Sequence, residues 1–403
     1  MNRLNQSIIA LNSFSTGILL PVFNLVMLER GSTLQTLPLL LAVYSATVLC
    51  MELPSGICAD KYGRREVFLM SCTFQFIAFS LLLAADDMLW LVFAVIFHGL
   101  GRAFSSGSLD ALIIDQALME KGEGCLAGVT ARMALLDGLG LAVGGIAGGL
   151  LADMAGSNTA NIILRIVFCV VLFIVVLFFI KEQPMHEKEV IITMAEHLRK
   201  GKGLLSAAPG LSYLLAGAFF TGIFLTSVET YWQPAFMQLN DSEGSTWLLG
   251  VIVFSGFASV AVGNLIVQKL LEKSSGSWWS IYNACRLILA ACISAFALQK
   301  GSVGFILWYS LAYMLLGSGN VAESTLINRL TPNNMRASIL SLSSLLLQIG
   351  ALGSSLLYSV LIMKLHFSGI WLLAGGLLGG YALVVTVASG RCKIIGKSGT
   401  EMM

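Results

Sequence analysis

The feature that most constrains this chain is a series of long apolar segments separated by short polar loops. A helix that crosses a bilayer needs about 20 consecutive, mostly apolar residues, since lipid cannot satisfy exposed backbone polar groups. Twelve segments meet this requirement: Ile8–Leu28, Gln35–Cys58, Val67–Ala85, Leu89–Ile114, Cys125–Ala152, Ile162–Ile180, Leu211–Met237, Trp247–Leu270, Trp279–Leu298, Gly304–Ile327, Ala337–Met363 and Ile370–Val387. The sequence therefore predicts an all-α membrane protein with twelve transmembrane helices.

The composition agrees with lipid as the surrounding solvent. Of the 403 residues, 57% are hydrophobic and 11% are charged, whereas about 25% of residues are charged in an ordinary soluble domain. A soluble protein of this composition could not keep enough apolar surface away from water. The formal net charge of +2 argues against nucleic acid as a partner, because such proteins carry a clustered basic face.

The chain carries no recognisable motif for a metal, a cofactor or an enzymatic reaction. Its eight cysteines are scattered, mostly inside the apolar segments, without a C-x-x-C pair. That spacing is typical of small buried side chains and not of a disulfide framework or a metal site. The sequence also lacks H-E-x-x-H, G-x-S-x-G and a phosphate-binding glycine loop followed by Lys. We therefore expect no enzyme, no metal and no cofactor.

The distribution of Lys and Arg predicts the orientation in the membrane. Seventeen lie in one set of loops and three, Arg30, Lys300 and Lys364, lie in the opposite set. Positive charge accumulates on the cytoplasmic side of membrane proteins. We therefore expect a multi-pass protein of the cytoplasmic (inner) membrane, with both termini in the cytoplasm and an even number of spans.

The longest polar segment divides the predicted helices into six and six. We expect an N-terminal six-helix bundle over residues 1–180, a cytoplasmic linker over 181–208, and a C-terminal six-helix bundle with a short tail over 209–403. The basic, amphipathic stretch at 188–202 suits contact with the inner membrane surface. A layout of six and six is typical of transporters built from two halves around a central cavity.

A short charged segment, Gly56–Arg65, joins the second and third predicted helices. Gly56 would let another helix approach closely, and Gly63 would permit a tight turn. Asp60 can face the positive N-terminus of a neighbouring helix. Arg64 and Arg65 can clamp carboxylates or anionic lipid headgroups.

This segment resembles the signature loop of the major facilitator superfamily, which has a glycine, an alanine-aspartate pair and then a glycine followed by basic residues. The resemblance implies a fold of two six-helix bundles and transport by alternating access. In that family the loop latches the two halves together, and an acidic residue at the inner end of the fourth helix completes the latch. Asp115 stands at the matching place, whereas the corresponding loop of the second half, Gln268–Ser277, lacks the pattern.

A glycine ladder in the fifth predicted helix, Gly140, Gly144, Gly148 and Gly149, resembles the motif that typifies drug/proton antiporters of this superfamily. Small residues four apart line one face of a helix and allow close backbone contact. The family pattern has proline after the second glycine, and this chain has Gly145 there. Antiport and generic helix packing therefore both remain open as explanations.

Charged residues inside the apolar segments are the third feature. Each costs about 2.5–3.5 kcal/mol at a helix centre, so a partner or a function is expected. The fourth and fifth predicted helices are antiparallel and joined by a short loop. Two residues at equal depth, one from each helix, therefore have sequence positions that add to a roughly constant value. That rule places Arg102 at the depth of Asp137, and Asp110 at the depth of Arg132. We expect Asp110 and Arg132 to form a structural ion pair. Arg165 is expected near an outer helix end, where its side chain can reach the headgroups.

One carboxylate in excess of the arginines could take up a proton, because a low-dielectric environment favours the neutral form of an acid. The candidates for proton coupling are Glu52, Arg102, Asp137, Glu229 and Glu323. Arg102 resembles the helix-four arginine associated with proton handling in such antiporters. His98 lies one turn before Arg102 and receives no role. Aromatic residues around Glu229 suit either a cationic amphiphile or an interfacial belt.

We therefore expect a secondary active transporter of a small molecule, most consistent with proton-coupled efflux of an amphiphilic or drug-like compound by a monomer. A uniporter or symporter for a metabolite, such as a lipid-like or organic-acid solute, is the alternative within transport. A transport-inactive receptor or scaffold is the alternative from another class, and the costly intramembrane charges argue against it.

Overall fold

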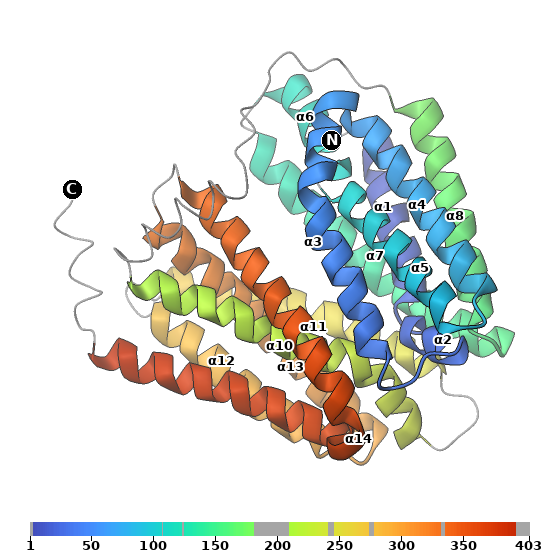
Figure 1. Ribbon diagram of the computed structural model, residues 1–403. Coiled ribbons are helices and arrows are strands. Elements are labelled where there is room, and N and C mark those ends of the chain that lie inside the picture. The colour runs from blue at the N-terminus through green and yellow to red at the C-terminus, as the bar shows by residue number, and fades with distance from the viewer. Residues whose placement is uncertain are drawn as a thin grey trace. The chain divides into compact units, whose positions relative to one another are not determined.

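The computed structural model describes residues 3–106, 108–122, 125–180, 209–240, 246–273, 278–331 and 335–391, and it contains helices and no strand within them (Figure 1). The linker expected at 181–208 lies outside these residues. The helices are α1 (Arg3–Leu19), α2 (Phe23–Glu29), α3 (Leu37–Tyr62), α4 (Arg64–Ala84), α5 (Met88–Ser105), α6 (Leu109–Lys121), α7 (Leu126–Ala155), α8 (Thr159–Phe179), α10 (Pro209–Leu239), α11 (Thr246–Lys273), α12 (Trp278–Ala297), α13 (Ser302–Leu330) and α14 (Arg336–Arg391).

Nine helical stretches in the described part of the chain are long and apolar enough to cross a membrane. Counting α1 and α2, which meet at a 45° bend, as one span gives ten. α3 carries a shorter apolar stretch, Leu37–Glu52, and the 56-residue α14 is broken at His366, whose φ is 52°. That break separates the last two predicted spans. The all-α membrane fold is confirmed, and the observed segments are consistent with twelve spans.

The described residues form two compact units. The first unit contains the described residues among 1–191 and 232–257, and the second contains those among 192–231 and 258–403. In the first unit α1 packs against α7 and α8, while α4 packs against α5 and α8 (Figure 1). In the second unit α12 packs against α13 and α14.

The first predicted span is broken where it contains Pro21. α1 ends at Leu19 and α2 begins at Phe23. Proline lacks a backbone N–H and clashes with the carbonyl of the preceding turn, so it interrupts the helical hydrogen-bond ladder. The side-chain amide of Gln233 spans this gap: its Nε2 donates to the Leu20 carbonyl at 2.5 Å, and its Oε1 accepts from the Asn24 N–H at 3.1 Å. A single glutamine therefore satisfies two backbone groups that the break exposes.

The fourth predicted span, Leu89–Ile114, is divided into α5 and α6 at its serine-rich middle. The Ser108 hydroxyl donates to the Phe104 carbonyl at 2.5 Å. Serine hydroxyls that bond nearby backbone groups compete with helical hydrogen bonds, which favours a break at such a site. A depth rule that assumes one continuous helix from Arg102 to Asp115 therefore does not hold across this break.

The glycine ladder of α7 presents two faces to two different helices. A side chain at Gly140, Gly144 or Gly148 would collide with the backbone or the Ser13 side chain of α1. A side chain at Gly149 would lie 2.7 Å from the Gly250 backbone nitrogen of α11, and one at Gly145 would collide with Val253. The ladder is thus required for close packing of α7 between α1 and α11, and all of these residues belong to the first unit.

Two large apolar clusters lie in the core of the first unit. One contains Val22, Met27 and Phe79, and the other contains Ile8, Phe68 and Leu172. Each cluster buries side chains from several helices, which supplies the packing contacts that hold a membrane bundle together. Members of both clusters also line a polar space between these helices.

Candidate functional site

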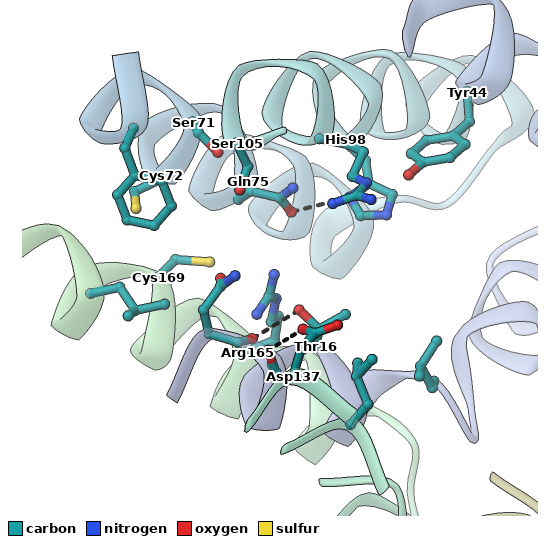
Figure 2. A pocket seen from close by; sticks show the side chains of 17 residues that line it. Thr16, Tyr44, Ser71, Cys72, Gln75, His98, Ser105, Asp137, Arg165 and Cys169 are labelled. Carbon is teal, nitrogen blue, oxygen red and sulfur yellow. Dashed lines mark hydrogen bonds between the residues drawn. The ribbon is translucent and has the colours of Figure 1, made fainter. Parts of the chain in front are cut away.

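A cavity of about 300 Å³ lies inside the first unit, between α1, α3, α4, α5, α7 and α8. Phe68 and Leu172 from one core cluster line it, as does Cys169 from the other. Figure 2 shows Gln75 and His98 on one side, with Thr16, Asp137 and Arg165 opposite them. Its polar lining consists of Asn12, Ser13, Thr16, Tyr44, Ser71, Gln75, His98, Arg102, Ser105, Asp137 and Arg165.

A second cavity of about 360 Å³ shares part of this lining. The shared residues are Asn12, Ser13, Arg102, Ser105 and Asp137, and the second cavity adds Asp110 and Thr130. Arg102 and Asp137 therefore border both spaces.

Asp137 is held by a hydrogen bond from α1. The Ser13 hydroxyl donates to Asp137 Oδ1 at 2.5 Å. Although Arg102 lines the same cavities, the two side chains form no ion pair within 4.0 Å in the described residues. Asp110 and Arg132 form none either, so the ion pair predicted between them is absent. The depth rule assumed one continuous helix through both Arg102 and Asp110, whereas α5 ends at Ser105 and α6 begins at Leu109.

Arg165 lies deep in the first unit, and the prediction that it reaches the headgroups is wrong. The residue is only 5% exposed. Its guanidinium donates a hydrogen bond to Ser15 Oγ and lies 5.3 Å from the centre of the Phe79 ring. Within the described ranges no carboxylate lies in ion-pair distance of it. One turn earlier on α8, Asn161 Nδ2 donates to the Ile18 and Gly148 carbonyls, each at 2.8 Å, which fixes α8 against α1 and α7.

His98 lies among three aromatic rings. The centres of the Phe23, Tyr44 and Phe79 rings are 5.5, 4.8 and 5.2 Å from its imidazole. Its Nδ1 is 3.1 Å from Gln75 Oε1. The histidine that the sequence left without a role is thus part of the cavity wall, packed on its apolar faces and bonded at its polar edge.

The segment Gly56–Arg65 consists of two helix ends that meet at one residue. α3 runs on to Tyr62, α4 begins at Arg64, and Gly63 between them has a φ of 97°. This left-handed conformation favours glycine, so Gly63 makes the predicted tight turn. Among the described residues, no atom lies within 4 Å of the position that a Cβ would take at Gly56. The side chain of Asp60 lies outside the described part of the structure.

The two arginines of this segment bind different partners. Arg64 forms an ion pair with Asp115 of α6, the acidic residue expected opposite it. Arg65 forms an ion pair with Glu66 at 2.5 Å, and its Nη2 donates to the Leu177 carbonyl near the end of α8 at 2.5 Å. Basic side chains commonly bond the last carbonyls of a helix. Arg65 therefore caps the C-terminal end of α8.

In the second unit Glu323 forms a buried ion pair with Arg286. Arg286 Nη2 donates to Glu323 Oε2 at 2.7 Å and to Asn320 Oδ1 at 3.0 Å. The side chains are 1% and 10% exposed. Arg286 also lies 5.3 Å from the centre of the Tyr282 ring, whose hydroxyl is 2.8 Å from that of Tyr381. This network ties α12 to α13 and α14.

The remaining candidates for proton coupling lie outside the two cavities. Glu52 is exposed on α3, and Glu229 is exposed on α10. The aromatic residues Phe224 and Tyr231 near Glu229 are buried with no exposed surface, so they pack within the second unit instead of forming a belt at the interface. Of the predicted coupling residues, the structure brings Arg102 and Asp137 together at a cavity.

A polytopic helical protein with charged residues lining a cavity among its membrane-spanning helices has features typical of membrane transporters. The chain is a member of the Major Facilitator Superfamily, whose family model matches residues 7–355. It is therefore a multi-pass transporter of the cell membrane with a small-molecule substrate, and it is not an enzyme.

Two relatives from bacteria are similar in sequence. The uncharacterized MFS-type transporter YxaM of Bacillus subtilis is 27% identical over 278 residues, which cover 66% of each chain. The multi-drug resistance efflux pump PmrA of Streptococcus pneumoniae is 25% identical over 288 residues, covering 69% of this chain and 67% of the pump. The matched region thus spans about two thirds of each relative.

Solved structures resemble the chain over nearly its whole length. The nucleoside transporter NupG superposes with a TM-score of 0.75 at 14% identity, covering 97% of this chain and 99% of NupG. A POT family transporter in complex with 5-aminolevulinic acid superposes with a TM-score of 0.75 at 12% identity, covering 97% and 96% of the two chains. At these identities the likeness shows the fold alone.

Proposed function

We propose that the protein exports an amphiphilic small molecule across the cytoplasmic membrane in exchange for protons. The observation that carries this proposal is the position of Asp137. Its carboxylate borders both cavities, accepts a hydrogen bond from Ser13, and has no ion-pair partner within 4.0 Å among the described residues. An acid inside a membrane protein is costly unless it is paired or functional, and intramembrane acids commonly carry protons in transporters.

Asp137 can exchange a proton while the substrate occupies the same space. When ionised, the carboxylate accepts the Ser13 hydroxyl hydrogen; when protonated, it can donate a hydrogen bond of its own. A bound substrate near Arg102 would change the stability of the charged form, which couples substrate binding to protonation. In this proposal the two halves, residues 1–180 and 209–403, expose the site alternately to the two sides.

Three further features belong to the proposal. The turn at Gly63 with the Arg64–Asp115 ion pair serves as a cytoplasmic gate, as the family resemblance implies. Both termini face the cytoplasm, as the Lys and Arg distribution predicts. The working form is a monomer.

Similarity to the multi-drug resistance efflux pump PmrA supports export of a drug-like compound. The alternative is a uniporter or symporter for a metabolite. Gly145 favours that alternative, because proline stands at this position in the antiporter pattern, and here the glycine packs against Val253. A scaffold without transport activity would not need the charged residues that line the first cavity, since charges inside membrane-spanning helices are expensive.

The test is transport in proteoliposomes that contain the purified protein. Fluorescent amphiphilic dyes are offered with and without an imposed pH gradient, and an ionophore that collapses the gradient serves as the control. Proton-coupled export predicts dye movement against its concentration gradient only when the pH gradient is present. Movement that equilibrates the dye equally with or without the gradient would instead identify a uniporter.

A further inference from the structure

The structure assigns Arg165 as the residue that binds an acidic group, such as a carboxylate, on the transported amphiphile. This inference rests on the proposed transport function and specifies the substrate class. Three independent observations carry it: the burial of Arg165 without a carboxylate partner, the charge of the cavity that it lines, and the apolar surface beside it.

The first observation is a buried cation with unused donors. Arg165 is 5% exposed, and its one hydrogen bond within the described residues goes to Ser15. A guanidinium has five N–H donors in a planar fork, so four remain for a ligand. Such a fork binds a carboxylate through two parallel hydrogen bonds, which is stronger than a bond to a neutral group. A buried arginine that lacks an anionic partner is destabilising, and a bound anion would supply that partner.

The second observation is the charge of the lining. Among the groups that border the first cavity, Arg102 and Arg165 are cationic and Asp137 is anionic. The balance therefore favours a ligand with a negative charge. Asp110 borders only the second cavity, together with Arg102 and Asp137. Both acids, Asp110 and Asp137, therefore border the second cavity, whereas Arg165 borders the first cavity and not the second.

The third observation is the surface available for the rest of the ligand. Tyr44 lines the cavity and stacks on His98, whereas Phe79, whose ring centre is 5.3 Å from the Arg165 guanidinium, is buried and lies outside the lining. Phe68, Leu141 and Leu172 add apolar lining to the cavity. A pocket that combines apolar surface with fixed polar groups can orient the polar group of a ligand and bury its apolar body. An amphiphilic acid has both parts.

A purely structural role for Arg165 explains these observations less well than a role in ligand binding. The tie between α8, α1 and α7 is already made by Asn161, which bonds the Ile18 and Gly148 carbonyls. A side chain needed only to contact Ser15 would not require a positive charge, which is costly inside a membrane. The guanidinium is therefore better explained by a ligand that it can bind.

The experiment measures ligand-induced thermal stabilisation of the detergent-solubilised full chain. The test ligands are three carboxylic acids with different apolar parts: hexanoate, phenylbutyrate and indoleacetate. Each is compared with the amide and the amine that carry the same apolar part. Binding to the folded state raises the unfolding temperature according to ligand affinity. We expect the acids to stabilise the wild-type protein more than the amides and amines do. We expect Arg165→Gln to weaken acid binding by at least about 30-fold, the loss typical of breaking a buried charge-assisted pair.

The matched control is Arg132→Gln, which removes an exposed arginine of α7 that lines neither cavity. It should bind the acids as the wild type does. If Arg165→Gln does not fold, Arg165→Lys replaces it: this variant keeps the charge and should keep the preference for acids at reduced affinity. Equal stabilisation by acids and amides, stabilisation by no acid of the series, or unchanged acid binding in Arg165→Gln or Arg165→Lys would overturn the assignment.

The outcome separates this inference from the proposed function. Acid binding that depends on Arg165, combined with transport that ignores a pH gradient, would support the anion site and reject proton coupling. Gradient-driven transport of amines or neutral dyes, without acid binding, would support the proposed export and reject the anion site.

Discussion

Arg64, at the first residue of α4, forms an ion pair with Asp115 of α6. The pair connects the turn at Gly63 to the helix on the C-terminal side of the break after α5. The two side chains are 20% and 28% exposed, so water screens their attraction only in part. An ion pair with this exposure is expected to influence where α6 lies more than it influences total stability.

Reversing the charges of this pair tests its role. Arg64→Asp and Asp115→Arg should each reduce transport severely while changing the free energy of unfolding by only about 1 kcal/mol, the upper end for exposed pairs. The double variant re-forms the pair with opposite polarity and should recover activity. Glu66→Gln, which removes the exposed partner of Arg65, is the control and should remain active. A double variant no better than the weaker single variant would argue against a gate at this pair.

The glutamine bridge across the first helix break should be important for stability. Gln233→Leu keeps the approximate size of the side chain and leaves the Leu20 carbonyl and the Asn24 N–H without their bonds to the amide. Each buried group left unpaired costs about 1–3 kcal/mol. We expect a clear fall in the unfolding temperature. Gln268→Leu, which loses only an exposed bond to Glu272, should unfold like the wild type. Equal temperatures for both variants would show that the bridge contributes little.

The glycines of α7 should differ in their tolerance of a methyl group. Gly148→Ala would drive a Cβ into the Ile18 carbonyl, whereas Gly138 has open space around it. We expect Gly148→Ala to lower yield and unfolding temperature strongly. Gly138→Ala should be neutral or stabilising by about 0.5–1 kcal/mol, since alanine is the better helix former. Expression and thermal unfolding of both variants provide the measurement.

Gly145 offers a second test of the same packing. Its added methyl group would meet the Val253 side chain and not backbone. Gly145→Ala should therefore be destabilising by itself and be rescued by Val253→Ala, which makes room for it. Failure of the rescue in thermal unfolding would mean that α7 and α11 do not pack as the structure has them.

The buried pair Arg286–Glu323 should be structural. Removing one partner leaves a buried charge, and Glu323→Gln or Arg286→Met should each destabilise the protein by about 3–5 kcal/mol. The double variant Arg286→Met with Glu323→Leu should recover most of that loss and keep gradient-driven transport. Loss of proton coupling in a well-folded double variant would return Glu323 to the group of proton carriers.

The membrane fold could be predicted because it depends on local composition. A run of apolar residues predicts a membrane-spanning helix, whichever other helices pack against it. The spacing of Gly140, Gly144 and Gly148 likewise indicates one helix face without knowledge of the neighbour. The sequence does not show that Gly145 and Gly149 face a different helix, because the neighbour α11 is distant in the chain.

The partners of the polar residues could not be predicted in the same way. A depth rule needs continuous helices, and the chain is broken at Pro21 and again between Ser105 and Leu109. Arg165 was expected at a helix end because sequence position gives approximate depth and no information on burial. Gln75 and Gln233 carried a usable signal, since an amide inside an apolar run needs a partner. The sequence contains no signal for which partner each amide has.

Asp137, as the proposed carrier of the coupled proton, can be tested directly. Proteoliposomes with an internal pH dye report proton movement when a transported dye is added. The wild type should show substrate-driven proton movement, and Asp137→Asn should reduce it to the level of protein-free liposomes while still binding substrate. Glu52→Gln, which neutralises an acid that lines neither cavity, should behave as the wild type. Undiminished substrate-driven proton movement in Asp137→Asn would contradict the assignment of Asp137 as the proton carrier.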